Sequence, residues 1–362
     1  MSNSLKTTPT KNLKSQKGVA LIIVLLIVAI VSVLATKMGS RLQLQVKRAS
    51  NIKENNQAYW YAMGAEQYAK KSLTELFSKE KVIHLNQPWN QEFTFPIEGG
   101  GIQAQLIDLQ SCFNLNALGV TSQSAGAGSN RISSPNGNST AASPSPNPTP
   151  TATLKDELKE RLNVFEQLVI GIDAEIPSYN IEIMRDSLAD WLDKDSRVTG
   201  LGAEDNEYES RQFPYMAANA LMVHESELRL VNGVEASWLP KVLELVCVIP
   251  NDDSLKINVN TVSEENVSII AAMTGMDISQ AQSAISARGE KGFQQASEFL
   301  DTPEVKAVTL NDNQKQWFDV TTSHFILHTK TKYNNATFAM QTVFKIEDGK
   351  KVSVIRREFS GF

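Results

Sequence analysis

The densest group of ionisable side chains lies between residues 186 and 210, in the segment DSLADWLDKDSRVTGLGAEDNEYES. Eight carboxylates stand there against two basic residues, and carboxylates this close together repel one another unless water or a cation neutralises them. The segment contains no histidine or cysteine, so its ligand atoms are oxygens, which favour a hard cation. Ca²⁺ takes roughly six to eight oxygen ligands in flexible loops, and residues 199–202 form such a glycine-rich loop.

A calcium site and a solvated acidic loop are the two interpretations of this segment. Its spacing is not that of an EF-hand, because Arg197 and Val198 stand where a ligand and a glycine belong. Trp191, Leu192 and Tyr208 lie among the acids, however, and large apolar side chains indicate a loop that is anchored to a hydrophobic core. We therefore expect bound calcium.

The sequence offers no catalytic constellation, so we expect no enzyme activity. A membrane-anchored hydrolase would need a nucleophile, a base and an orienting group, and no serine or cysteine stands in such a motif. Cys112 and Cys247 are the only cysteines, too few for a disulfide scaffold or a cysteine zinc site. They form either one bridge in an oxidising compartment or two buried thiols.

The elements that position the acidic segment begin with an apolar run. Residues 19–36 carry no charge and span roughly 28 Å as a helix, close to the hydrocarbon thickness of a bilayer. The preceding residues include four lysines and no acid, so the positive-inside rule keeps residues 1–18 in the cytoplasm. A secretory signal peptide is the alternative, but the run is too long and lacks an A-x-A-like cleavage site.

Beyond the membrane, the pattern predicts an α+β fold. Residues 37–80 contain no proline and continue the helix, first as a polar stalk and then with an apolar face. Residues 81–112 and 313–362 alternate apolar and polar side chains between turn signals, which predicts an antiparallel sheet that is split in the sequence.

Residues 113–312 form a helical insertion with an internal duplication. The segment FNLNAL from Phe113 matches INVNTV from Ile257, and each copy is followed by Gly-x-Asp and by an aromatic-Leu-Asp triplet. We expect a first unit at 113–245 and a second at 256–305. Residues 119–153 are rich in Ser, Pro, Gly and Asn, which predicts a mobile loop within the first unit.

The second unit resembles helix-hairpin-helix or SAM-like domains, some of which bind the DNA backbone through a glycine-rich hairpin. Here the hairpin keeps only Gly275, and acids outnumber bases from Lys256 to Asp301. A phosphate-binding face needs clustered cations, and the net charge of −5 gives no wider case for nucleic acid. We therefore expect this unit to dock protein, and keep a DNA-binding minor type IV pilin or competence protein as the alternative.

Taken together, these residues resemble the K-type minor pseudopilin family of type II secretion systems. The resemblance covers nearly the whole chain and is carried by the basic leader ending in Gly18, the split strands around a two-part helical domain, FNLNAL, D-W-x-D-x-D and G-A-E-D-x-x-Y. Pilin-like chains usually carry Glu at the fifth mature position, where this chain has Ile23.

The resemblance implies that a prepilin peptidase cuts after Gly18 and methylates the new amino terminus at Val19. It implies an inner-membrane protein whose bulk is periplasmic. It also implies a place at the tip of the pseudopilus with I-type and J-type minor pseudopilins, above an inner-membrane assembly platform. There the subunit would help initiate filament assembly and export folded periplasmic proteins across the outer membrane. The family's calcium loop maps onto Asp193, Asp195, Glu204 and Asp205, with Asp190 and Glu207 as further candidates.

Overall fold

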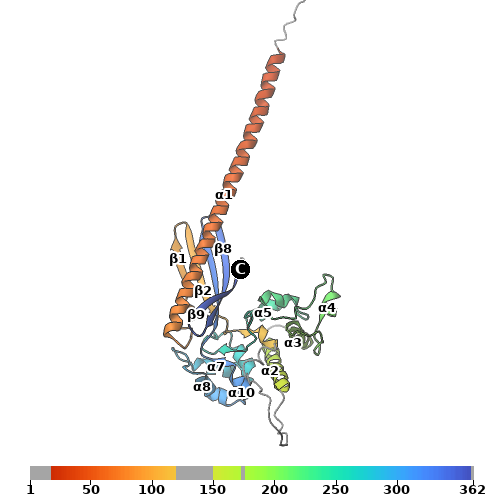
Figure 1. Ribbon diagram of the computed structural model, residues 1–362, viewed down its shortest axis with the longest axis vertical. Coiled ribbons are helices and arrows are strands. Elements are labelled where there is room, and N and C mark those ends of the chain that lie inside the picture. Colours follow the sequence, from red (N-terminus) through yellow and green to blue (C-terminus); the bar gives the residue numbers. More distant parts are fainter. Residues whose placement is uncertain (1–17, 120–149, 173–175, 360–362) are drawn as a thin grey trace, which may run out of the picture.

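The computed structural model describes residues 18–119, 150–172 and 176–359, arranged as a long helix, a sheet and a helical insertion (Figure 1). Helix α1 (Val19–Lys79) runs without interruption from the apolar segment into the folded part. It ends where Glu80 becomes extended and donates its N–H to the Leu76 carbonyl. The prediction of one continuous helix is confirmed. The leader, residues 1–17, lies outside the described residues.

The sheet has five antiparallel strands in the order β1-β2-β7-β8-β9. Their bounds are β1 (Phe93–Ile97), β2 (Gly100–Asp108), β7 (His324–Tyr333), β8 (Ala336–Glu347) and β9 (Lys351–Phe359). Strand β7 returns after the insertion and pairs with β2, so the predicted split sheet is confirmed. The tight turns need left-handed backbone, which Gly99 (φ +82°) and Gly349 (φ +64°) adopt readily because glycine has no Cβ atom to clash with the backbone.

Helix α1 packs against one face of this sheet, over β7 and β8. Its buried residues recur at helical spacing, and they meet the inward side chains of the strands in one core. Members of that core include Ala65, Ala69, Leu73, Leu106, Phe325 and Phe344. The first half of α1 leaves this contact and is exposed, as expected of an anchor and stalk.

The insertion between β2 and β7 consists of helices, of which α2 and α3 are the longest, and two small parallel sheets. In the first unit these are β3 (Phe113–Asn114), η2 (Leu115–Leu118), α2 (Pro150–Ile170), α3 (Ser178–Leu192), α4 (Asp205–Glu209), η3 (Glu225–Leu230), α5 (Leu239–Leu243) and β4 (Val246–Cys247). In the second they are β5 (Ile257–Asn258), α6 (Ser268–Thr274), α7 (Ile278–Ser286), α8 (Ala296–Leu300), α9 (Pro303–Lys306), α10 (Asp312–Lys315) and β6 (Phe318–Asp319). A single-turn helix, η1 (Pro88–Asn90), precedes β1.

Two expected boundaries need correction. The insertion extends past residue 312 to Asp319, because β6 pairs in parallel with β5 instead of joining the main sheet. Helix α2 begins at Pro150, so residues 150–153 of the predicted loop are helical; proline is tolerated in a first helical turn because its missing N–H would be unbonded there. Residues 120–149, the rest of the predicted mobile loop, lie outside the described residues.

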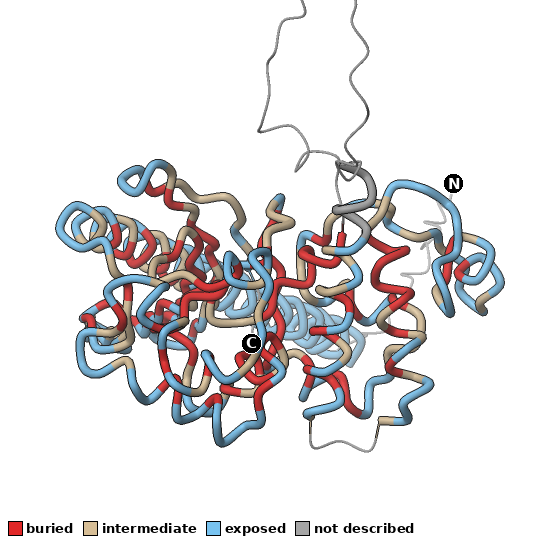
Figure 2. The backbone as a smooth tube through the Cα atoms, turned by 90° about the horizontal axis from the view of Figure 1, so that it is seen from below, coloured by how far each residue is buried: buried red, intermediate tan, exposed pale blue. Residues whose placement is uncertain are grey.

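The two units of the insertion share one continuous hydrophobic core, and buried stretches run through both in Figure 2. The duplicated motif has the same role in each. Asn116 donates to the Met222 carbonyl and accepts from the Met222 N–H, and Asn260 makes the same pair of bonds with Phe293. Each asparagine thereby holds a distant backbone segment of its own unit, so the repeated motif has the same structural role in both units.

Candidate metal site and the elements that position it

The acidic segment joins the end of α3 to the start of α4. Asp193 is the first residue beyond α3, and Glu204 immediately precedes α4. Near these two positions in the chain, Trp191 on α3 and Tyr208 on α4 pack edge to face, with their ring centroids 5.3 Å apart. Both rings are almost fully buried, so the acidic loop is anchored to the core of the first unit.

Two buried carboxylates on α3 hold the loop in place. Asp186 accepts the N–H of Leu201 at 2.9 Å, and Asp190 accepts the N–H of Thr199 at 3.0 Å. A Cβ at Gly200 would lie 2.2 Å from the Asp186 carboxylate, and one at Gly202 would lie 2.0 Å from that of Asp190. The glycines therefore let the backbone approach the two carboxylates closely. The role of Asp186 was not anticipated from the sequence.

Among the described residues, one group of three carboxylates lies close enough to share a cation. Asp193, Asp195 and Glu204 each offer an oxygen, and these atoms lie within 4.8 Å of one another. Both carboxylate oxygens of Glu204 are buried and have no hydrogen-bond partner in the protein. A buried polar group without a partner is costly, and a cation shared by the three carboxylates would offset that cost.

The electrostatics of the group agree with that conclusion. Burial, followed by repulsion from Asp190 and Asp193, raises the pKa of Glu204 to about 7. Burial raises the pKa of Asp190 to about 6, and it also raises the pKa of Asp193. By contrast, hydrogen bonds from Arg197 lower the pKa of Asp195. An oxygen-only set of mutually repelling carboxylates suits a hard divalent cation such as Ca²⁺.

The other sequence-predicted ligands are placed differently. Asp190 is buried beneath the loop and bonds its backbone. Asp205 lies next to Glu204 and accepts the N–H of Ala217 at 2.9 Å. Glu207 is exposed on α4. The structure thus gathers Asp193, Asp195 and Glu204 and leaves these three outside the group.

The predicted processing site lies at the start of α1. Gly18 precedes the first helical residue, Val19, and a Cβ at Gly18 would meet no atom within 4 Å. Within the part of the chain that is described, α1 is the one helix long and apolar enough to cross a membrane. It therefore fits the expected membrane anchor.

Two further features bear on the sequence-based alternatives. Cys112 and Cys247 form a disulfide, the first of the two possibilities left open for them. In the second unit, Gly275 (φ +76°) ends α6, and the Asp277 carboxylate accepts the Gln280 N–H at the start of α7. That acid places negative charge where a phosphate would have to bind, so the hairpin does not favour nucleic acid.

Comparisons with known proteins point to one family. Two family models, both described as type II secretion system (T2SS), protein K, match residues 111–251 and 257–321 respectively. The type II secretion system protein K of Aeromonas hydrophila is 30% identical over 95% of this chain and 97% of that protein. The Pseudomonas aeruginosa protein K is 33% identical over 79% of this chain and 76% of that protein.

A solved structure shares the fold. It is the GspK–GspI–GspJ complex from the type 2 secretion system of enterotoxigenic Escherichia coli. One chain of that structure matches with a TM-score of 0.69 and 28% identity, and the match covers 87% of the present chain and 100% of the matched chain. The α+β architecture expected from the sequence is confirmed by this match. None of the relatives compared above bears the name of an enzyme.

Proposed function

The chain belongs to the protein K family of the type II secretion system, and on that premise we propose that it is a structural minor pseudopilin at the tip of the pseudopilus. In that place it helps to initiate filament assembly with I-type and J-type minor pseudopilins on the inner-membrane platform. It thereby serves the export of folded periplasmic proteins across the outer membrane.

The observation that carries the proposal is where the helical insertion lies. It stands beyond the end of the sheet that is farthest from the apolar start of α1 (Figure 1). In a filament, a subunit placed beyond this end of the chain would collide with the insertion. At the end of the filament no such neighbour is present, and the insertion can project freely. Ile23 supports the same place, because a pilin-like glutamate at that position would pair with a subunit ahead, and a tip subunit has none.

Imaging tests the tip assignment. A label on an exposed residue of the second unit, such as Glu265, should appear at one end of each assembled filament. Labels repeated at regular intervals along the shaft would contradict the proposal. The same label on a major subunit of the filament serves as the control, since it should decorate the whole shaft.

Calcium binding and maturation belong to the same proposal. Asp193, Asp195 and Glu204 would hold Ca²⁺, which would neutralise their charges and tie the end of α3 to the start of α4. Prepilin peptidase would cut after Gly18 and methylate Val19, so mass spectrometry of the mature protein should find Val19 first. A mature terminus beyond Ala35 would instead mean an ordinary signal peptide.

A further inference from the structure

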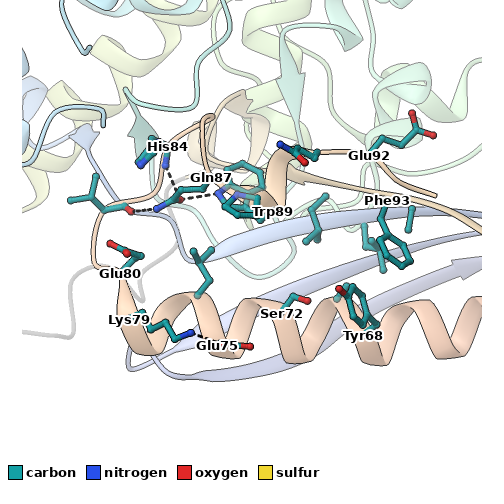
Figure 3. A pocket seen from close by; sticks show the side chains of 18 of the residues that line it. Tyr68, Ser72, Glu75, Lys79, Glu80, His84, Gln87, Trp89, Glu92 and Phe93 are labelled. Carbon is teal, nitrogen blue, oxygen red and sulfur yellow. Dashed lines mark hydrogen bonds and ion pairs between the residues drawn. The ribbon is translucent and has the colours of Figure 1, made fainter. Parts of the chain in front are cut away.

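A groove of about 870 Å³ runs along the folded half of α1 (Figure 3). One wall is the helix, from Tyr68 to Lys79, and the other is the connection that carries His84 and Trp89. Its floor consists of apolar side chains from α1, β2 and β7. The groove exists because α1 covers β7 and β8 and leaves the edge strand β1 beside it partly uncovered.

Exposed aromatic rings continue the groove at its membrane-facing end. Phe93 and Phe95 pair with Ala104 and Ile102, both in the core under α1, so they share the helix-covered face of the sheet. Tyr68 stacks on Phe93 at 4.9 Å between ring centroids, and Phe93 lies 6.2 Å from Phe95. Tyr68 is 55% exposed and Phe95 is 52% exposed, although both are large rings in a folded part of the chain.

The character of the rim indicates a protein as the occupant. Its charged side chains are three acids and two lysines, so the rim carries mixed charge with almost no net sign: Glu75, Glu80, Glu92, Lys79 and Lys291. A nucleic acid or another strongly charged ligand would require a rim of one sign. Exposed aromatic rings around an apolar floor with a mixed polar rim are instead typical of protein interfaces.

The orientation of the groove relative to the membrane limits which kind of protein can occupy it. The second unit is fixed near the far end, where Asn86 donates to the Glu290 carbonyl at 2.8 Å. The end with Tyr68 and Phe95 faces the stalk, so an occupant arrives alongside the helix or from the membrane side. Subunits anchored in one membrane by N-terminal helices stand parallel to one another, and the similar solved chain is in a complex with GspI and GspJ.

We propose that the groove between α1 and β1, with Tyr68, Phe93 and Phe95 at its mouth, is the surface that binds a neighbouring minor pseudopilin of another type. The inference rests on the proposed function and adds to it the residues of contact. The neighbour contributes an apolar segment that lies along α1 and covers the aromatic rings. The same contact leaves the insertion free at the far end.

Site-specific photocrosslinking in the full-length, membrane-anchored chain tests this surface. A photoreactive phenylalanine at position 68 or 95, co-produced with the I-type and J-type partners, should crosslink to one of them. Tyr179 on α3 is the matched control, because it is 62% exposed but lies in the insertion, and it should give no such product. Crosslinks from positions 68 and 95 only to a second copy or to a secreted protein would overturn the proposal.

A substitution series provides the second readout. Tyr68→Ser combined with Phe95→Ser should lower the amount of co-purified partner by about tenfold or more, with Tyr179→Ser unchanged. Thermal melting of each variant checks that the fold is retained. Equal amounts of partner co-purified with the wild type and with the double variant would overturn the groove alone. A wild-type chain that captures no pseudopilin would contradict the proposed function as well.

Discussion

Glu204 is the residue on which the calcium proposal depends. It precedes a helix of one turn, it is 3% exposed, and its carboxylate has no donor in the protein. Natural proteins seldom bury a carboxylate in that way, because several kcal/mol of solvation would be lost without compensation. In the proposed site, a cation shared with Asp193 and Asp195 would supply the compensation.

Calcium should therefore stabilise the insertion. A ligand that binds only the folded state at a hundredfold excess over its Kd adds about 2.7 kcal/mol, which should raise the melting temperature by about 5 °C. Asp193→Asn and Glu204→Gln should each remove most of this increment. Glu207→Gln is the control, since its side chain is exposed and lies outside the group.

The same increment should depend on pH. The pKa of Glu204 is raised from 4.5 to about 7, so in chelator its contribution to stability is present at low pH and is lost as pH rises through about 7. Calcium must displace that proton, so the calcium increment should be larger at about pH 7.5 than at about pH 5.5. Equal melting of the wild type in calcium and in chelator at the higher pH would refute the metal assignment.

At the scale of elements, α1 is tied to the sheet by a buried ion pair. Glu66 on α1 is fully buried and accepts two hydrogen bonds from Arg357 on β9, at 2.6 and 2.9 Å. Thr342 on β8 donates to the same carboxylate at 3.1 Å. The pair fixes how the helix is rotated on the sheet, and hence which side of α1 faces β1 and the groove.

Removing this carboxylate should destabilise the folded part. Glu66→Ala leaves Arg357 and Thr342 without their acceptor, and breaking a buried pair costs about 3 kcal/mol when one partner retains some contact with water, as Arg357 does here. Chemical denaturation measures the change. Glu75→Ala removes an exposed pair with Lys79 on the same helix and should leave the denaturation midpoint almost unchanged. Equal effects of the two substitutions would contradict the assigned role of Glu66.

At the scale of the whole molecule, a buried polar joint connects the sheet to the insertion. Asp108, the last residue of β2, accepts hydrogen bonds from Thr261, Thr322 and Asn258, and Asn258 also donates to the Ile83 carbonyl. Burial raises the pKa of Asp108 to about 6 against these donors, which lower it. The network couples the second unit to the sheet.

The disulfide closes the first unit at its base. Cys112 lies between the end of β2 at Asp108 and the start of β3 at Phe113, Cys247 lies on β4, and 135 positions separate the two cysteines. A link across so long a loop restricts the unfolded chain, so Cys112→Ser with Cys247→Ser should cost about 4 kcal/mol. Limited proteolysis should then cut the first unit faster and leave the sheet protected. A reductant should have no effect on the double variant, and an unchanged midpoint for that variant would contradict a structural role for the bridge.

Local sequence patterns were enough to predict the long elements and their order. An uncharged run can cross a membrane only as a helix, strand alternation needs a covered face, and Gly-rich turns fix hairpins, so α1, the split sheet and the helical insertion could all be predicted from local patterns. The paired Asn-x-Asn motifs likewise predicted two related units, and in each unit the second asparagine of the motif bonds a distant backbone segment.

Contacts between distant segments could not be predicted in this way, because they depend on how the elements pack. The acidic segment predicted a metal site but not which of its acids would form it. In the structure Glu204 is buried without a partner, the carboxylate of Asp190 holds the loop, and Glu207 is exposed. The same holds for the disulfide and for the extension of the insertion to Asp319. Residue spacing fixes which side chains can share a helix or strand face, whereas only packing fixes which faces meet and which polar atoms lose water.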